Sequence, residues 1–201
     1  MFFIVTGPSG CGKSTIVRGV LKEVKDINFS VSHTTRQKRL LEEEGRDYYF
    51  VSKEEFEQMI KEENFVESAI VYGNYYGTSK KELEKKGFRN DLILDIDVQG
   101  AQQVKGRLKK AIFVFILPPE FVELEERLIK RGDLEPQTIE ERLEIAKKEI
   151  RYYSQFDYII INDKLNQAVK ELSSIILSVR CRLDIRQKEI LSILRSFIEE
   201  E

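Results

Sequence analysis

The segment Gly7–Ser14 constrains this chain more than any other part of its sequence, because it fits the pattern G-x-x-x-x-G-K-[S/T]. A short apolar and β-branched run, Phe2–Thr6, precedes it and predicts a buried strand, and the residues from Ser14 onward predict a helix. A strand, a glycine-rich loop and a helix N-terminus direct backbone N–H groups and the positive end of the helix toward one point. The sequence therefore predicts a phosphate-binding loop here.

Two side chains of this loop and two acids elsewhere indicate a metal-assisted site. Lys13 supplies a mobile positive charge for the outer phosphates of a nucleotide, and the Ser14 hydroxyl is placed to bind Mg²⁺. The run Leu92–Asp97 predicts a second buried strand that ends in Asp95 and Asp97, which would point to the same face of a strand. Acids at a strand end near a phosphate loop are typical Mg²⁺ partners, so we expect Asp95 to join Ser14 as a metal ligand.

The composition excludes several classes of protein. The 201 residues include 33 Lys and Arg against 35 Asp and Glu, so a net charge of -2 leaves no field to capture nucleic acid or an anionic membrane. No apolar run approaches the roughly 20 residues of a membrane span, and Met1 leads directly into the first predicted strand without a signal-peptide pattern. Only two cysteines are present, Cys11 and Cys181, and the first lies in the phosphate loop. We expect a cytoplasmic protein without a disulfide, nucleic acid or membrane partner.

The apolar runs predict the fold class. Four continuous runs indicate parallel strands covered on both faces, and they are Phe2–Thr6, Leu92–Ile96, Ile112–Leu117 and Tyr158–Ile161. Helical patterns alternate with them, around residues 14–25, 98–108, 119–131 and from 164 onward. This order predicts an α/β fold, a P-loop NTPase-type doubly wound parallel sheet whose core comprises residues 1–28, 91–130 and 158–180.

Two further segments predict parts outside this core. Residues 29–90 carry shorter, more polar runs and predict an inserted, mainly antiparallel lobe. Its elements would be strands at Phe29–Thr34, Tyr48–Val51 and Phe65–Tyr72 and one helix near 53–62. Residues 131–157 are highly charged and predict a helical lid, with Gly132 as a hinge.

The C-terminal extension, residues 181–201, continues an apolar helical stripe. The stripe consists of Ala168, Leu172, Ile176, Val179 and Leu183, and after a break at 186–188 it resumes with Ile190, Leu191, Leu194, Phe197 and Ile198. Two interpretations remain open. The extension is either a long last helix packed on its own domain, or a helix that pairs with another subunit to form a homo-oligomer.

Several further motifs, in a fixed order, make residues 1–178 resemble the guanylate kinase family. They are Gly7–Ser14, Phe29–Arg36, Arg39, Gly45–Ser52, Phe65–Glu67, Gly73–Thr78, Ile93–Gly100, Arg131–Gly132 and Ile161–Asp163. The resemblance implies a Mg²⁺-dependent transfer of the γ-phosphoryl group of ATP to GMP, which yields GDP and ADP in purine nucleotide metabolism. It also implies dGMP as a second acceptor.

The resemblance further implies the role of each site residue. The ATP-binding residues would be Gly7, Pro8, Ser9, Gly10, Cys11, Gly12, Lys13, Ser14, Thr15, Arg127 and Asn162. The guanine contacts would be Ser32, Glu67, Thr78 and Asp97, and the clamp for the GMP phosphate would be Arg36, Arg39, Tyr48 and Tyr76. The lid arginines Arg131 and Arg142 would approach the transferring group, and they would complete a catalytic set with Lys13, Arg36 and Arg39.

The chemistry of these side chains suits a guanine nucleotide. Carboxylates accept hydrogen bonds from the guanine N1–H and N2–H₂ groups, hydroxyls can donate to its acceptors, and arginine forks match phosphate oxygens. One departure from the family pattern is the run Leu40–Glu44, which replaces a Pro-Gly-like turn after Arg39. Within the loop, Cys11 is either a small filler or a reactive thiol with a lowered pKa.

Two rival functions differ from this hypothesis in class. The first is a related P-loop kinase with another phosphorylated acceptor, such as a ribose bisphosphate, and Glu67 and Asp97 argue against it. The second is a non-catalytic guanylate-kinase-like module that binds proteins. Such modules lack a working phosphate loop, whereas Lys13 and Ser14 are present in this chain.

Overall fold

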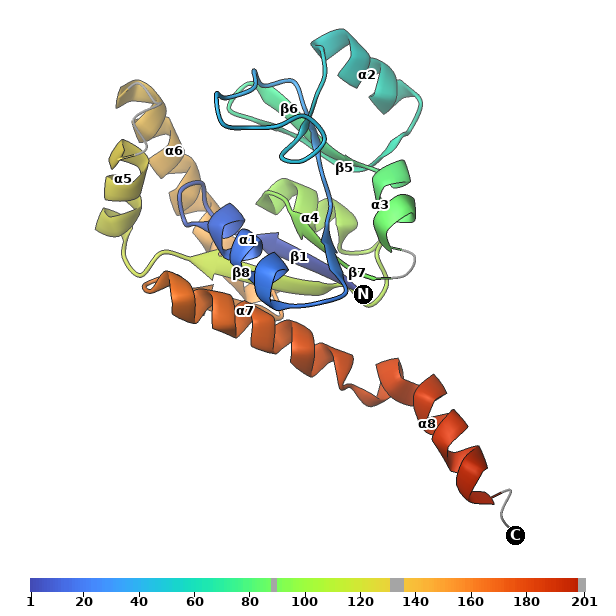
Figure 1. The fold of residues 1–201 in the computed structure, drawn as a ribbon. Coiled ribbons are helices and arrows are strands. Elements are labelled where there is room, and N and C mark those ends of the chain that lie inside the picture. The colour runs from blue at the N-terminus through green and yellow to red at the C-terminus, as the bar shows by residue number, and fades with distance from the viewer. Residues whose placement is uncertain (88–89, 131–135, 199–201) are drawn as a thin grey trace.

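The computed structural model describes residues 1–87, 90–130 and 136–198 (Figure 1). The strands are β1 (Phe2–Thr6), β2 (Ile27–Phe29), β3 (His33–Thr34), β4 (Tyr49–Phe50), β5 (Phe65–Val71), β6 (Asn74–Ser79), β7 (Asp91–Asp95), β8 (Ile112–Leu117) and β9 (Tyr158–Ile161). The helices are α1 (Lys13–Glu23), α2 (Lys53–Lys61), α3 (Lys80–Gly87), α4 (Val98–Val104), α5 (Phe121–Lys130), α6 (Pro136–Glu149), α7 (Leu165–Arg180) and α8 (Leu183–Ile198). A 3₁₀ helix, η1 (Ile150–Gln155), follows α6.

A parallel sheet forms the core, as the four continuous apolar runs predict. Its strand order is β2-β7-β1-β8-β9, and every neighbouring pair is parallel. The predicted doubly wound fold class is therefore confirmed. The strand predicted at Phe29–Thr34 is wrong, because it is two strands: Phe29 aligns with Ile93 in the core sheet, whereas His33–Thr34 belongs to the inserted lobe.

Alternation along the central strand divides the core into two layers. Phe3 and Val5 of β1 face a cluster with α1 and α7, and Ile4 between them faces a second cluster with α3 and α4. Both clusters are closed by fully buried side chains, so helices cover the sheet on both faces (Figure 1). This packing holds the loop after β1 at the carboxyl edge of the sheet, where ligands of such folds bind.

The inserted lobe contains a second sheet of four strands, in the order β4-β3-β6-β5. The pairs β3–β6 and β5–β6 are antiparallel, whereas β3 and β4 are parallel. The strand β6 was not predicted, because its sequence Asn74–Ser79 is polar and contains a glycine. Helix α2 begins with a capping box in which Ser52 and Glu55 satisfy each other's backbone N–H groups.

The described part of the segment predicted to be a lid is helical. Helix α6 packs on α5 through a small cluster in which Leu143 and Ala146 contact Leu124 and Leu128. Arg131 and the predicted hinge Gly132 lie outside the described residues.

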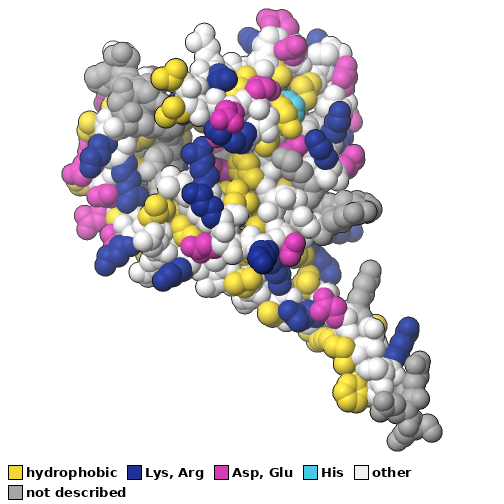
Figure 2. All heavy atoms as spheres, in the orientation of Figure 1, with side chains coloured by type: hydrophobic (Ala, Val, Ile, Leu, Met, Phe, Trp, Pro, Cys, Tyr) yellow, Lys and Arg dark blue, Asp and Glu magenta, His cyan; other side chains and the backbone are white. Residues whose placement is uncertain are grey.

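The C-terminal extension does not continue α7. The helix α7 ends at Arg180, six residues before the start of the predicted break, and Leu183 begins α8 rather than closing the stripe on α7. Helix α8 leaves the domain, and Figure 1 shows it running away from the sheet. Leu183 and Phe197 are each 73% exposed, and Figure 2 shows apolar side chains along this tail. The interpretation that the whole extension packs on its own domain is therefore wrong. Among the described helices, none is long and apolar enough to cross a membrane.

Candidate active site

The phosphate loop joins β1 to α1, and its backbone conformation depends on glycine. Gly12 has a φ of 96°, and a Cβ atom there would lie 2.3 Å from the amide nitrogen of Asn162. The Lys13 ammonium folds back on the loop and donates to the carbonyl oxygens of Gly7 at 2.6 Å and Pro8 at 3.3 Å. Burial alone would lower the pKa of Lys13, but nearby Cys11, Asp95 and other acidic groups outweigh it and hold that pKa above its usual value. The loop therefore carries a fixed positive charge.

Side chains behind the loop hold its backbone in place. The Asn162 amide donates to the Cys11 carbonyl at 2.7 Å, and Arg127 donates to the Asn162 carbonyl at 2.8 Å. These two residues, predicted to bind ATP, thus contact the loop itself. The Cys11 side chain is fully buried, and burial raises the pKa of its thiol, so the interpretation as a small filler is favoured over that of a reactive thiolate.

The two predicted metal ligands lie side by side. The Ser14 hydroxyl donates to Asp95 Oδ2 at 2.8 Å. Across the described chain, no group of three or more His, Cys, Asp or Glu side chains could hold a metal ion. One hydroxyl and one carboxylate suit Mg²⁺, which keeps several waters and takes other ligands from substrate phosphates. This donor set therefore fits Mg²⁺ that arrives with ATP.

Asp97 does not share a strand face with Asp95, contrary to the prediction. Strand β7 ends at Asp95, and Asp97 is the N-cap of α4, where its Oδ1 accepts from the Gly100 N–H at 2.8 Å. Its buried Oδ2 has no hydrogen-bond partner within the described ranges. Because the chain turns between the two acids, Asp95 contacts the phosphate loop, whereas Asp97 keeps one carboxylate oxygen, Oδ2, available as an acceptor.

The four residues predicted to contact guanine form one cluster, in which Ser32, Glu67 and Thr78 are buried and Asp97 is half-buried. Glu67 of β5 is paired with Thr78 of β6, and the Ser32 and Thr78 hydroxyls are 3.4 Å apart. Asp97 approaches Glu67 from the core, and a Cβ atom at Gly100 would lie 2.5 Å from Glu67 Oε2 and 3.1 Å from Asp97 Oδ1. Glycine at position 100 therefore allows the Glu67 and Asp97 carboxyl groups to lie close to the first turn of α4.

Burial decides the protonation of this cluster. The Glu67 side chain is 3% exposed, and burial raises its pKa to about 7, with Asp97 adding to the rise and hydrogen bonds from Thr78 opposing it. Burial likewise raises the pKa of Asp97. A buried carboxylate is stabilised most by a ligand that donates N–H hydrogen bonds to it.

The residues predicted to clamp the GMP phosphate also lie together. Arg36 stacks over the Tyr48 ring at 5.4 Å, and the Tyr48 and Tyr76 ring centroids are 5.9 Å apart. Glu42 accepts from Arg36 Nη2 at 2.7 Å and from the Arg39 backbone N–H at 2.9 Å. The loop that departs from the family pattern thus keeps the two arginines together, while Leu40 and Leu41 at its tip are exposed.

Helix α6, in the segment predicted to be a lid, brings a charged group to the phosphate loop. Arg142 of α6 donates to the Ser9 hydroxyl at 2.9 Å and lies over the Tyr72 ring at 4.3 Å. Glu149, the last residue of α6, has a pKa that burial raises to about 7. Its Oε2 atom is buried and has no hydrogen-bond partner in the part of the chain that the structure describes.

Sequence reasoning missed three residues of this neighbourhood: Glu42, Tyr72 and Glu149. Glu42 and Glu149 stand in strongly charged stretches, and such stretches usually form solvated surfaces. The positive φ of Tyr72 could not be deduced, although the following Gly73 is a turn signal.

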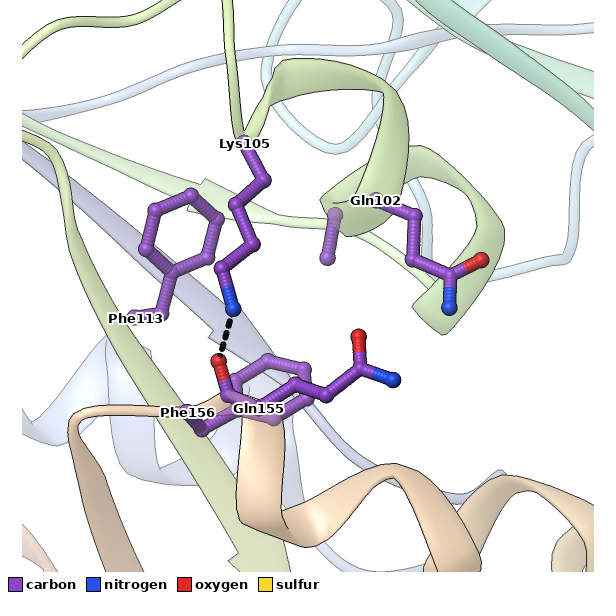
Figure 3. A pocket seen from close by; sticks show the side chains of 6 residues that line it. Gln102, Lys105, Phe113, Gln155 and Phe156 are labelled. Carbon is purple, nitrogen blue, oxygen red and sulfur yellow. Dashed lines mark hydrogen bonds between the residues drawn. The ribbon is translucent and has the colours of Figure 1, made fainter.

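A separate small pocket lies between α4 and η1 (Figure 3). It is lined by Ala101, Gln102, Lys105, Phe113, Gln155 and Phe156, none of which belongs to the predicted site. The Lys105 ammonium donates to the Gln155 carbonyl and lies 5.8 Å from the Phe113 ring. These contacts tie the end of α4 to η1, the last part of the segment predicted to be a lid.

The doubly wound sheet, with a glycine loop, a half-buried lysine and a hydroxyl–carboxylate pair at its carboxyl edge, defines a P-loop nucleotide kinase. The profile of the family described as guanylate kinase matches residues 2–179. The chain is 46% identical to the guanylate kinase of Clostridium tetani, a match that covers 100% of this chain and 97% of that protein. It is 40% identical to the guanylate kinase of Coxiella burnetii, with 99% and 97% covered.

A solved structure agrees with the sequence relatives. The crystal structure of guanylate kinase from Anaplasma phagocytophilum superposes with a TM-score of 0.74 at 31% identity, covering 90% of this chain and 87% of that chain. The chain belongs to the guanylate kinase family.

Proposed function

We propose that this protein transfers the γ-phosphoryl group of ATP to GMP, and to dGMP, with Mg²⁺. Family membership supports the reaction class, and one local observation supports the acceptor. That observation is the cluster of Ser32, Glu67, Thr78 and Asp97, where two carboxyl groups and two hydroxyls meet and all but Asp97 are buried. This set complements the guanine edge, which offers N1–H and N2–H₂ as donors.

The residues divide into a donor side and an acceptor side. On the donor side, the loop N–H groups and Lys13 hold the ATP phosphates, and Ser14 with Asp95 would hold Mg²⁺, which neutralises charge on those phosphates when bound. On the acceptor side, Arg36 and Arg39 grip the GMP phosphate. Because the acceptor is an ionised phosphate, no general base is required, and catalysis depends on alignment and positive charge.

The lid arginines supply the remaining positive charge. Arg142 already lies at the phosphate loop, where it contacts Ser9, and we assign it to the transferring phosphoryl group. Arg131 keeps the same role by resemblance, although it lies outside the described residues. Closure of the lid would exclude water and limit wasteful hydrolysis of ATP.

The test is a coupled ADP-release assay across GMP, dGMP, AMP, CMP, UMP and ribose bisphosphate. We expect kcat/KM for GMP to exceed that for AMP by about 10⁴-fold, since a site built on hydrogen bonds rejects an analogue that leaves them unmade. A preference for ribose bisphosphate would support the related-kinase alternative instead. A protein that binds GMP but releases no ADP would support the non-catalytic alternative.

We also propose that α8 pairs with a second copy of this chain. Its apolar side chains are exposed, including Leu191 and Leu194, at 51% and 48%, and an unpaired apolar stripe of this length favours association. Ending the chain at Arg182 should therefore reduce the oligomer to a monomer while phosphoryl transfer persists, because none of the proposed site residues lies in α8.

Light scattering at several concentrations measures this effect. The matched pair of variants is Leu191→Glu/Leu194→Glu on the apolar side and Ser192→Glu/Ser196→Glu on the polar side of α8. Only the first pair should yield monomers. A monomeric full-length protein would contradict the proposal.

A further inference from the structure

One side chain of the acceptor lobe contacts the lid helix at the phosphate loop. Tyr72 lies in the two-residue turn between β5 and β6, and the Arg142 guanidinium of α6 lies 4.3 Å from the centre of its ring. The same guanidinium donates to the Ser9 hydroxyl at 2.9 Å. Lobe, lid and phosphate loop, three separate parts of the chain, therefore meet at Arg142.

The turn that carries Tyr72 is strained. Val71 pairs with Asn74, and the two residues between them both have positive φ values, 50° at Tyr72 and 74° at Gly73. Such turns favour asparagine followed by glycine, and a large aromatic residue at positive φ is a genuine outlier. Strain of this kind persists where surrounding structure fixes it, and it is concentrated at functional sites.

The contacts of the Tyr72 ring explain how the strained turn is held in place. Burial raises the pKa of Tyr72, and a hydrogen bond with Ser9 opposes that rise, so the phenol is held at the loop. The Arg142 Nε atom is buried and has no hydrogen-bond partner among the residues that the structure describes. A guanidinium with an unused N–H group, steadied on one face by an aromatic ring, can donate further hydrogen bonds to phosphate oxygens.

We propose that Tyr72 is a positioning residue for phosphoryl transfer, because its ring holds Arg142 over the phosphate loop. The proposal rests on the proposed function, in which Arg142 stabilises the transferring group. It predicts that the orientation of the catalytic arginine on the lid depends on a side chain of the acceptor lobe.

The variant Tyr72→Asn tests this proposal, because asparagine suits the turn and removes the ring. We expect its melting temperature to equal or exceed that of the wild type, while kcat falls about tenfold, within the range that a cation–π contact supplies. The KM for GMP should change little, since Glu67 and Thr78 are untouched. A merely structural role of the turn would instead raise that KM. Tyr72→Phe, which keeps the ring, should recover most of the lost kcat.

Glu63→Asn is the matched control, because Glu63 also has a positive φ, of 54°, in the same lobe and is exposed. This variant should leave both kinetic parameters unchanged. A double-mutant cycle with Arg142→Gln completes the test. In the Arg142→Gln background, Tyr72→Asn should have no further effect on kcat.

Each contrary outcome has a distinct meaning. Equal losses from Tyr72→Asn in both backgrounds, an unchanged or raised kcat for Tyr72→Asn alone, or a loss in Tyr72→Phe as large as that in Tyr72→Asn would overturn the positioning role. A fully active Arg142→Gln variant would instead remove the assigned role of Arg142, and with it part of the proposed function.

Discussion

Replacing Lys13 by methionine is expected to lower kcat about 10²- to 10³-fold or more while the protein remains folded. The Lys13 ammonium is the fixed positive charge of the phosphate loop, where it donates to the carbonyl oxygens of Gly7 and Pro8. Removing one preorganised electrostatic group from a closed site typically costs a factor of this size. Methionine keeps the apolar stem of the lysine, so the buried space around it stays filled.

The same substitution, Lys13→Met, is expected to lower the stability of the folded protein. The folded state raises the pKa of Lys13, so the charged lysine contributes stability below its unfolded pKa, which includes neutral pH. The variant should therefore melt at a lower temperature than the wild type, yet unfold in one cooperative transition. Lys22→Met, at an exposed position of the same helix, serves as the control and should change neither property. A Lys13→Met variant with nearly wild-type kcat would be incompatible with the kinase assignment.

The parts of the fold that could be predicted are those encoded in contiguous sequence. The phosphate loop is one uninterrupted pattern, and the runs at β1, β7 and β8 are continuously apolar because helices cover both faces of the sheet there. The edge strand β9 is apolar as well, although its Tyr158, Ile159 and Ile161 side chains are exposed. By contrast, β2 is only three residues long, and its identity as a core strand depends on pairing with β7, far away in the sequence.

Other features could not be predicted because they depend on where the chain turns. The apolar stripe passes smoothly from Val179 to Leu183, with neither glycine nor proline to mark the end of α7, so the break there was invisible. Asp95 and Asp97 look equivalent in sequence, and only the end of β7 at Asp95 separates their roles. The sequence around Glu42 predicts a solvated side chain, and only the fold shows that it forms an ion pair with Arg36.

Base choice is expected to depend chiefly on Glu67. The guanine edge donates two N–H groups, whereas adenine presents an acceptor at N1 and no amino group at C2, so a carboxylate facing adenine loses its partners. Leaving a buried charged acceptor unpaired costs about 1–3 kcal/mol or more. Glu67→Gln should raise the KM for GMP and shrink the GMP/AMP ratio of kcat/KM at least tenfold, with little change in the KM for ATP. Steady-state kinetics with both acceptors measures this, and Glu84→Gln on the exposed side of α3 is the control.

The same residue sets an expected pH dependence. Because burial raises the pKa of Glu67 to about 7, the free protein holds a neutral acid below that pH, whereas guanine binding requires the ionised acceptor. The KM for GMP should thus fall as the pH rises from 6 toward 7 and level off above it. The GMP phosphate itself titrates near pH 6, but this contribution remains in Glu67→Gln, so the difference between the two pH profiles isolates the carboxyl group.

Stability should change in the opposite direction to affinity. An acid whose folded pKa lies above its unfolded value favours the folded state less as the pH rises between the two, here from 4.5 to about 7. Glutamine has no such ionisation, so Glu67→Gln without nucleotide should be more stable than the wild type at pH 8, by as much as about 3 kcal/mol. A ligand that donates hydrogen bonds to the ionised Glu67 would offset this loss of stability when it binds. If Glu67→Gln and Asp97→Asn both leave the GMP/AMP ratio intact, the guanine assignment is wrong, and another phosphorylated acceptor becomes the better explanation.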